Sequence, residues 1–143
     1  MNDNYEYLPK SIQKLKQNFT QRKSKGVNSF LTIEDYLDWY NSKEKKCFYC
    51  GIEESILQEI VMTGILKSAR FPENGTIGRG QSRGVWLEVD RLNPKGNYSR
   101  ENCVLACYFC NNDKSDVFHG TDYNSFNIDR PNYLRALLKK HSK

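Results

Sequence analysis

The chain has 143 residues, the length of a single domain, and its formal net charge is +5. Hydrophobic residues make up 38% of the sequence and no apolar run is long enough to span a bilayer, so a membrane-spanning protein is excluded. The basic excess favours a polyanionic partner, and because the polar start of the chain shows no secretory signal we expect a reducing, cytoplasmic setting.

Residues 1–30 form the first predicted unit, a polar and basic N-terminal arm or helix. Ile12, Leu15 and Phe19 recur at helical spacing, and Pro9 is expected in the first turn. Two interpretations stay open: a basic helix that lies along phosphates, or a solvated amphipathic helix that packs one weak face on the domain. The basic side chains are those of Lys10, Lys14, Lys16, Arg22, Lys23 and Lys25.

Residues 31–143 form the second predicted unit, which is largely helical at its two ends. Thr32 is a natural N-cap for a helix that ends near Asn41, because acidic residues follow in the first turn, where the helix dipole favours them. A broad apolar face predicts a further helix over residues 53–68. A last helix is predicted over residues 129–143, where basic residues suit its C-terminal end.

A glycine-rich stretch over residues 71–84 predicts a flexible loop. Arg79 and Arg83 make this loop basic. They are candidate contacts to DNA, in a loop that orders on binding, and the alternative is an ordinary solvated loop.

The stretch that follows predicts a β-hairpin. Residues 85–90 alternate as a strand does, so Glu88 and Asp90 point to the same face. The segment 93–97 has the asparagine, proline and glycine of a tight turn, and it carries the basic Lys95. The chain then returns as a second strand over residues 98–105.

The five cysteines divide into two pairs and a remainder. Cys47 and Cys50 form one C-x-x-C pair, and Cys107 and Cys110 form the other. Two such pairs are the usual composition of a structural zinc site, because zinc takes four soft ligands in a tetrahedron. Cys103 is left over, and we expect it to be a buried, unligated thiol. A disulfide framework is the alternative, which the paired spacing and the missing signal disfavour.

The stretch from residue 87 to 114 resembles the HNH, or ββα-metal, nucleases in their zinc-stapled form. The resemblance covers about half of the chain and implies an α+β fold, a small ββα-metal (HNH/treble-clef-like) core with a four-cysteine zinc, flanked by helices. Residues 51–84 then look like an insertion in this core. With the upstream pair included, the positions of the family pattern fall on Cys47, Cys50, Asp90, Arg91, Glu101, Asn102, Cys107, Cys110, Asn111 and Lys114.

One position departs from the family pattern. Arg91 stands where the family usually has its general-base histidine, and a guanidinium cannot accept a proton. Another group would serve as base, or the metal would activate water unaided, or the site is inert. Glu88 shares a face with Asp90, and Tyr98 or His119 are further candidates. Arg91 itself would clamp phosphate, or form an ion pair with Asp90 or Glu88.

The remaining roles follow from the chemistry and from the resemblance. Asp90 is the best candidate for a carboxylate on a catalytic Mg²⁺ or Mn²⁺. The resemblance implies that Asn111 supplies an amide oxygen to the same ion and that Asn102 braces the hairpin loop. Lys95 and Lys114, together with the two loop arginines, are candidate nucleic-acid contacts.

Three functions compete. The first is a metal-dependent HNH-type endonuclease that hydrolyses phosphodiester bonds in DNA, with RNA as another possible substrate. The second is a zinc-stapled nucleic-acid-binding module whose catalytic centre has decayed. The third is a small partner subunit of a larger nuclease or defence complex, and either a protein partner or a homodimer is compatible with the sequence. Small proteins that look like this one occur in phages and in bacterial defence.

Overall fold

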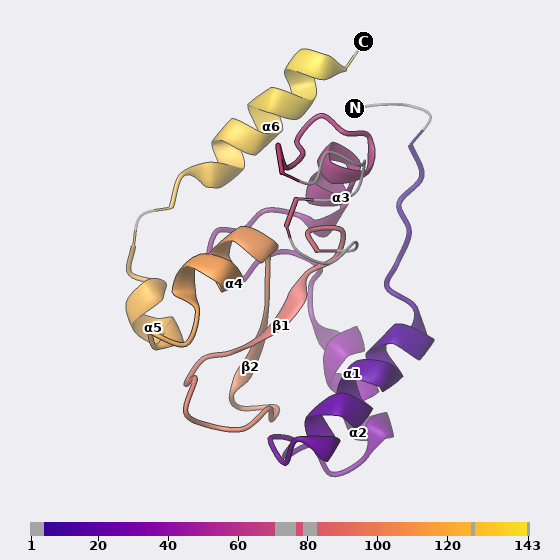
Figure 1. Ribbon diagram of the computed structural model, residues 1–143, viewed down its shortest axis with the longest axis vertical. Coiled ribbons are helices and arrows are strands. Elements are labelled where there is room, and N and C mark those ends of the chain that lie inside the picture. The colour runs from indigo at the N-terminus through magenta and orange to yellow at the C-terminus, as the bar shows by residue number, and fades with distance from the viewer. Residues whose placement is uncertain (1–4, 71–76, 79–82, 127, 143) are drawn as a thin grey trace.

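The computed structural model describes residues 5–70, 77–78, 83–126 and 128–142. Over these residues the chain forms helices around one short β-hairpin, as expected for the α+β class (Figure 1). The elements in chain order are α1 (Ile12–Ser24), α2 (Ile33–Ser42), α3 (Glu54–Met62), β1 (Glu88–Arg91), β2 (Cys103–Ala106), α4 (Tyr108–Lys114), α5 (Gly120–Tyr123) and α6 (Arg130–His141). None of the helices in the described part has the length and apolar character that a bilayer crossing requires.

The hairpin pairs β1 with β2 in antiparallel register, so that Glu88 lies opposite Ala106 and Arg91 opposite Cys103. Both strands are shorter than the sequence predicts. Leu87 donates its backbone N–H to the Glu54 side chain of α3 (2.7 Å) instead of to a strand. The return segment begins by pairing with the chain after α1, since the N–H of Tyr98 donates to the carbonyl of Val27 (2.8 Å).

Helices α1 and α2 lie together at the lower end of Figure 1, and the buried aromatic side chains of α2 belong to the hydrophobic core. Tyr36 and Trp39 are buried, and they pack with Phe30 and with Phe19 of α1. The N-terminal helix therefore shares the core of the rest of the chain. Thr32 caps α2 by accepting a hydrogen bond from the N–H of Asp35 (3.1 Å), which confirms the predicted start of this helix.

The start of α1 differs from the prediction. Ser11 is the N-cap and accepts from the N–H of Lys14 (3.1 Å), so Pro9 lies before the helix and the expectation that it occupies the first turn is wrong. Ile12 is 62% exposed, while Leu15 and Phe19 face the core. The apolar face of α1 is thus narrower than its sequence spacing indicates.

Most of helix α3 is buried, including its polar residues Glu54, Gln58 and Glu59. It ends at Met62, earlier than the predicted residue 68, and Gly64 follows with a left-handed φ of +76° that reverses the chain. Helix α3 also packs against α6.

The polar side chains of α3 fasten two other segments. The Gln58 amide donates to the carbonyls of Leu8 (3.0 Å) and Val85 (3.2 Å). The Tyr7 hydroxyl donates to Glu54, which also accepts from the backbone of Leu87 (2.7 Å). These bonds satisfy groups that would otherwise be buried without partners, and they fix both the N-terminal segment and the chain that enters β1.

Two features after β2 are not anticipated by the sequence. Helix α4 begins at Tyr108, inside the second C-x-x-C pair, because Cys107 acts as its cap. The short helix α5 follows, and its Gly120 N–H donates to the carbonyl of Leu92 (2.6 Å). A Cβ at Gly120 would lie 2.7 Å from the Tyr49 hydroxyl, so this close approach needs glycine.

Candidate functional site

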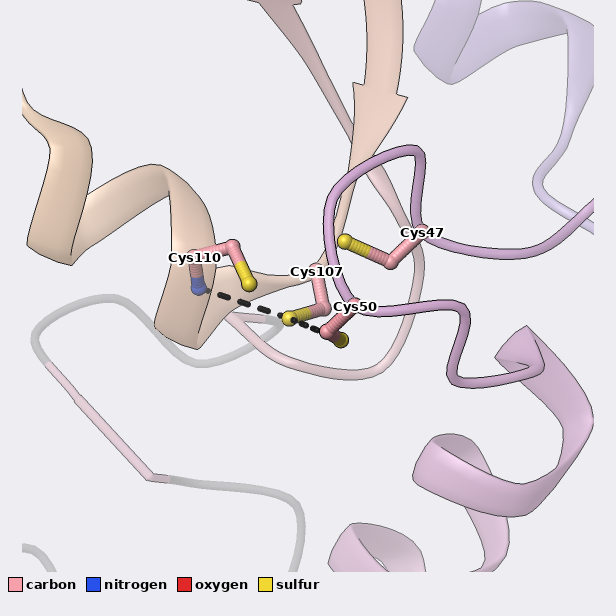
Figure 2. A group of neighbouring side chains, drawn as sticks. All are labelled: Cys47, Cys50, Cys107 and Cys110. Atoms are coloured by element: carbon pink, nitrogen blue, oxygen red, sulfur yellow. Dashed lines mark hydrogen bonds between the residues drawn. The ribbon is translucent and has the colours of Figure 1, made fainter. Parts of the chain in front are cut away.

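The two C-x-x-C pairs come together as the spacing predicts (Figure 2). Their four sulfur atoms all lie within 4.8 Å of one another, and the sulfurs of Cys50 and Cys107 are 3.9 Å apart. Tetrahedral coordination with bonds of about 2.3 Å places sulfurs about 3.8 Å apart, so the set fits one zinc-sized ion. Cys103 is buried on β2 outside this cluster, as expected.

The turn from Cys47 to Cys50, the first zinc knuckle, is held in place by its own backbone and by β2. The N–H of Gly51 donates to the carbonyl of Cys47 (2.9 Å), and Gly51 has a φ of +80° that a side chain would strain. The N–H of Phe48 donates to the carbonyl of Leu105 on β2 (2.8 Å). The cluster therefore joins the α2–α3 connection to the end of the hairpin.

The four thiols of the cluster need positive charge nearby in order to ionise together. The guanidinium of Arg130, from the start of α6, donates to the Cys110 sulfur (3.2 Å). Hydrogen bonds to Cys110, Cys47 and Cys50 raise the pKa of Cys107, because four crowded thiols cannot all ionise without a cation. A divalent metal would remove that repulsion, and Arg130 would offset part of the remaining negative charge.

Asp90 lies next to the knuckle on the side of β1 that faces α4. It is 6% exposed, and its two oxygens accept from Tyr49 (2.6 Å) and from the Lys114 ammonium (3.2 Å). Burial raises the pKa of Asp90, against the opposing effects of these two partners. A carboxylate offers about four lone-pair positions, so positions remain for a cation.

Glu88 shares that face of β1, as predicted, and forms a second polar cluster. Arg83 donates to both of its oxygens, from Nε to Oε2 (2.6 Å) and from Nη2 to Oε1 (3.2 Å). The Nδ2 of Asn111, in α4, donates to Oε1 of Glu88 (2.6 Å). The amide carbonyl of Asn111 is then the atom of that side chain left to bind a metal.

Arg91 forms neither of the ion pairs considered for it. Its guanidinium donates to the carbonyl of Gly96 (3.1 Å) and stacks over the ring of Tyr98, 4.9 Å from the ring centre. Asn102 ties the hairpin loop together, with its amide donating to the carbonyls of Asn93 and Asn97 (3.0 Å each). Asn102 thus makes the bracing contacts that the resemblance implies.

The four candidate nucleic-acid contacts are in different surroundings. Lys95 is exposed at the tip of the hairpin loop. Arg83 is half-buried against Glu88. Lys114 is 1% exposed and pairs with Asp90, which removes it from the surface that a nucleic acid contacts. Arg79 lies outside the described residues.

Two residues near the site have roles that the sequence does not reveal. Tyr49 lies between Cys47 and Cys50, and its hydroxyl donates a hydrogen bond to Asp90. Its place inside the C-x-x-C turn is the one feature of the sequence that indicates a position near the metal cluster. His119, considered as a base, instead caps α5 by accepting from the N–H of Thr121 (3.2 Å).

A cleft of about 350 Å³ opens between the N-terminal segment and β1. Lys10, Lys14 and Arg22 line one wall, and Arg83, Glu88 and Asn111 line the other. Two of the candidate catalytic residues, Glu88 and Asn111, therefore border this basic cleft.

Comparison with solved structures decides the fold. The rare-cutting HNH restriction endonuclease PacI, described for its DNA perturbation, superposes with a TM-score of 0.62. The match covers 95% of this chain and 90% of PacI, with 23% sequence identity. The chain has the fold of an HNH endonuclease. Comparisons with models of protein families and with curated proteins gave no match.

The HNH fold accounts for the architecture just described. The ββα unit predicted from the sequence is formed by β1, β2 and α4, with the four-cysteine cluster at its base (Figure 2). The likeness spans nearly the whole chain, so the N-terminal helix and α3 also fall within the matched region.

Proposed function

We propose that this protein is a metal-dependent endonuclease that hydrolyses phosphodiester bonds in DNA. The proposal rests on the position of Asp90, a buried carboxylate on the ββα unit held by Tyr49 and Lys114. The shared fold with an HNH restriction endonuclease supports the nuclease class, and the net charge of +5 suits a polyanionic substrate.

The proposal includes two metal sites with different chemistry. The four cysteines would hold zinc as a structural ion, since their sulfurs already approach tetrahedral spacing. Asp90 and the Asn111 carbonyl would hold a hard divalent cation, Mg²⁺ or Mn²⁺, because both offer oxygen. When bound, that cation stabilises the negative charge that develops on the phosphate and on the leaving oxygen.

The protein side chains would accept a proton, position the Asp90 carboxylate and bind phosphate. Glu88 borders the cleft and would take a proton from the attacking water, whose oxygen bonds to phosphorus as one P–O ester bond breaks and the leaving oxygen takes up a proton. Tyr49 already donates its hydroxyl proton to Asp90, so it positions that carboxylate. Arg91 remains a cation next to the loop and would bind phosphate.

Plasmid nicking tests the proposal. We expect zinc-loaded protein with Mg²⁺ or Mn²⁺ to nick or cut supercoiled plasmid, and Asp90→Asn or Asp90→Ala to abolish cutting. Asp38→Asn, on the exposed face of α2, is the matched control and should cut like wild type. Undiminished cutting by the Asp90 variants with full zinc content would rule out this assignment.

Variants at two residues locate the proton acceptor. Glu88→Gln should lose cutting while it still binds DNA, because an amide cannot accept the proton. Tyr49→Phe removes one hydrogen bond from Asp90 and should retain part of the activity. Normal cutting by Glu88→Gln combined with a dead Tyr49→Phe would transfer the role to Tyr49.

One observation favours the second candidate function, a nucleic-acid-binding module without catalysis. Arg91 occupies the usual base position, and it is fastened to Gly96 and Tyr98 as a structural residue would be. A protein that shifts DNA in a gel with steep salt dependence but never cuts it, whichever divalent cation is added, would support this function over the first.

A further inference from the structure

The basic residues of the N-terminal segment divide into two faces. Lys14, Asn18 and Arg22 are spaced four apart on α1 and lie on one side of the helix, and Lys10 continues that row before the cap. All four line the cleft described above. Lys16 and Lys23 are exposed elsewhere on α1.

The cleft concentrates positive charge. Lys10, Lys14, Arg22 and Arg83 line it, and Glu88 is the acidic residue among its described lining, where it is paired with Arg83. Burial, followed by the charge of Arg22, lowers the pKa of Lys10 to about 8, while Glu88 and Glu54 act in the opposite direction. Crowded cations of this kind are stabilised by a bound anion.

The aromatic rings of the cleft are covered by the same cations. The Lys14 ammonium lies over the Trp86 ring, 5.3 Å from its centre, and Arg22 stacks over Tyr98 at 4.3 Å. Arg91 stacks over that Tyr98 ring as well, at 4.9 Å. The rings are therefore engaged with cations, and what the cleft presents to a ligand is positive charge, which binds phosphate without reading bases.

We propose that the cleft between α1 and β1 holds the phosphate backbone of the substrate strand, with Lys10 and Lys14 as phosphate ligands. This deepens the proposed function, on which it rests for the identity of the substrate. Glu88 and Asn111 form the opposite wall, so a strand held there would lie directly beside the candidate catalytic residues. The N-terminal helix would then be part of the active-site wall.

A pair of double variants with equal charge change tests the proposal. Lys10→Gln with Lys14→Gln removes two cations from the cleft, and Lys16→Gln with Lys23→Gln removes two from the exposed face. Binding of a short labelled duplex, and of one of its strands, is measured without divalent metal over a range of salt. Circular dichroism and zinc content verify that both proteins are folded.

Loss of two phosphate contacts makes the slope of log K against log salt shallower by about 1.8. If variant and wild type bind equally at 1 M salt, the variant then binds about 60-fold more weakly than wild type at 0.1 M salt. The cleft variant should show this loss and the exposed-face variant a small one. Equal losses of DNA affinity in both variants would refute phosphate binding in the cleft, even if wild type cuts plasmid. If wild type never cuts DNA but the cleft variant still loses binding selectively, the nuclease proposal is refuted and the proposal of a phosphate-binding cleft is supported.

Discussion

The ion pair between Asp90 and Lys114 gives the most demanding test, because the same carboxylate is asked to stabilise the fold and to bind a metal. The two side chains are 6% and 1% exposed, and Oδ1 of Asp90 lies 3.2 Å from the ammonium. At an effective dielectric constant of about 20, two charges at that distance attract by about 5 kcal/mol. Removing one partner leaves the other charge buried and unpaired.

We therefore expect Asp90→Asn and Lys114→Met each to lower the free energy of unfolding by about 3–5 kcal/mol. The double variant removes both charges and keeps side chains of similar volume, so it should recover most of that loss. Urea unfolding of zinc-loaded protein, followed by the fluorescence of the buried Trp39, measures all three. Glu53→Gln, in an exposed pair with Arg135, should change stability by less than about 1 kcal/mol.

Activity then separates the two roles of the carboxylate. The double variant should be stable and still fail to cut plasmid, since a neutral amide in place of the Asp90 carboxylate is a poorer ligand for a divalent cation. If both single variants unfold like Glu53→Gln, the buried pair does not exist. If the stable double variant cuts normally, Asp90 does not hold the catalytic metal.

Other consequences are open to direct measurement. Removing zinc with a strong chelator should unfold the ββα unit, because structural zinc contributes about 10–16 kcal/mol in small sites, and an unchanged circular dichroism spectrum would contradict this. Cys103→Ala should keep the full zinc content, and a loss of metal would place Cys103 among the ligands. Gly120→Ala puts a Cβ 2.5 Å from Leu92 and 2.7 Å from the Tyr49 hydroxyl, so melting temperature and cutting should both fall. DNA affinity should weaken as the pH rises through about 8, where Lys10 loses its proton and its positive charge, and Lys10→Arg should flatten this dependence.

Much of the candidate site is encoded at short range. The paired cysteines predict the four-sulfur cluster because each C-x-x-C turn presents two thiolates to one point. Thr32 predicts the start of α2 because a cap depends on residues three positions away. Glu88 and Asp90 fall on one face because strand side chains alternate. Interactions of this kind need no knowledge of which elements pack together.

The partners of those residues are set by packing between distant segments. Asp90 meets Tyr49 and Lys114, which are 41 and 24 residues away, and neither contact is implied by any local pattern. Lys114 looks like a surface cation in the sequence, yet burial turns it into the counter-ion of Asp90. The ends of β1 and β2 are likewise decided by α3 and by the chain after α1, which take the hydrogen bonds that longer strands would use.

By itself the sequence determined the metal-type cysteines, the acidic face of the hairpin and the basic character of the N-terminal segment, because spacing and composition fix them. Only the tertiary structure decided which cations face the cleft, since Lys10 and Lys14 are distinguished from Lys16 by where α1 docks. Docking depends on the sum of many weak apolar contacts along α1 and α2, and periodicity specifies the face of each helix without specifying its partner.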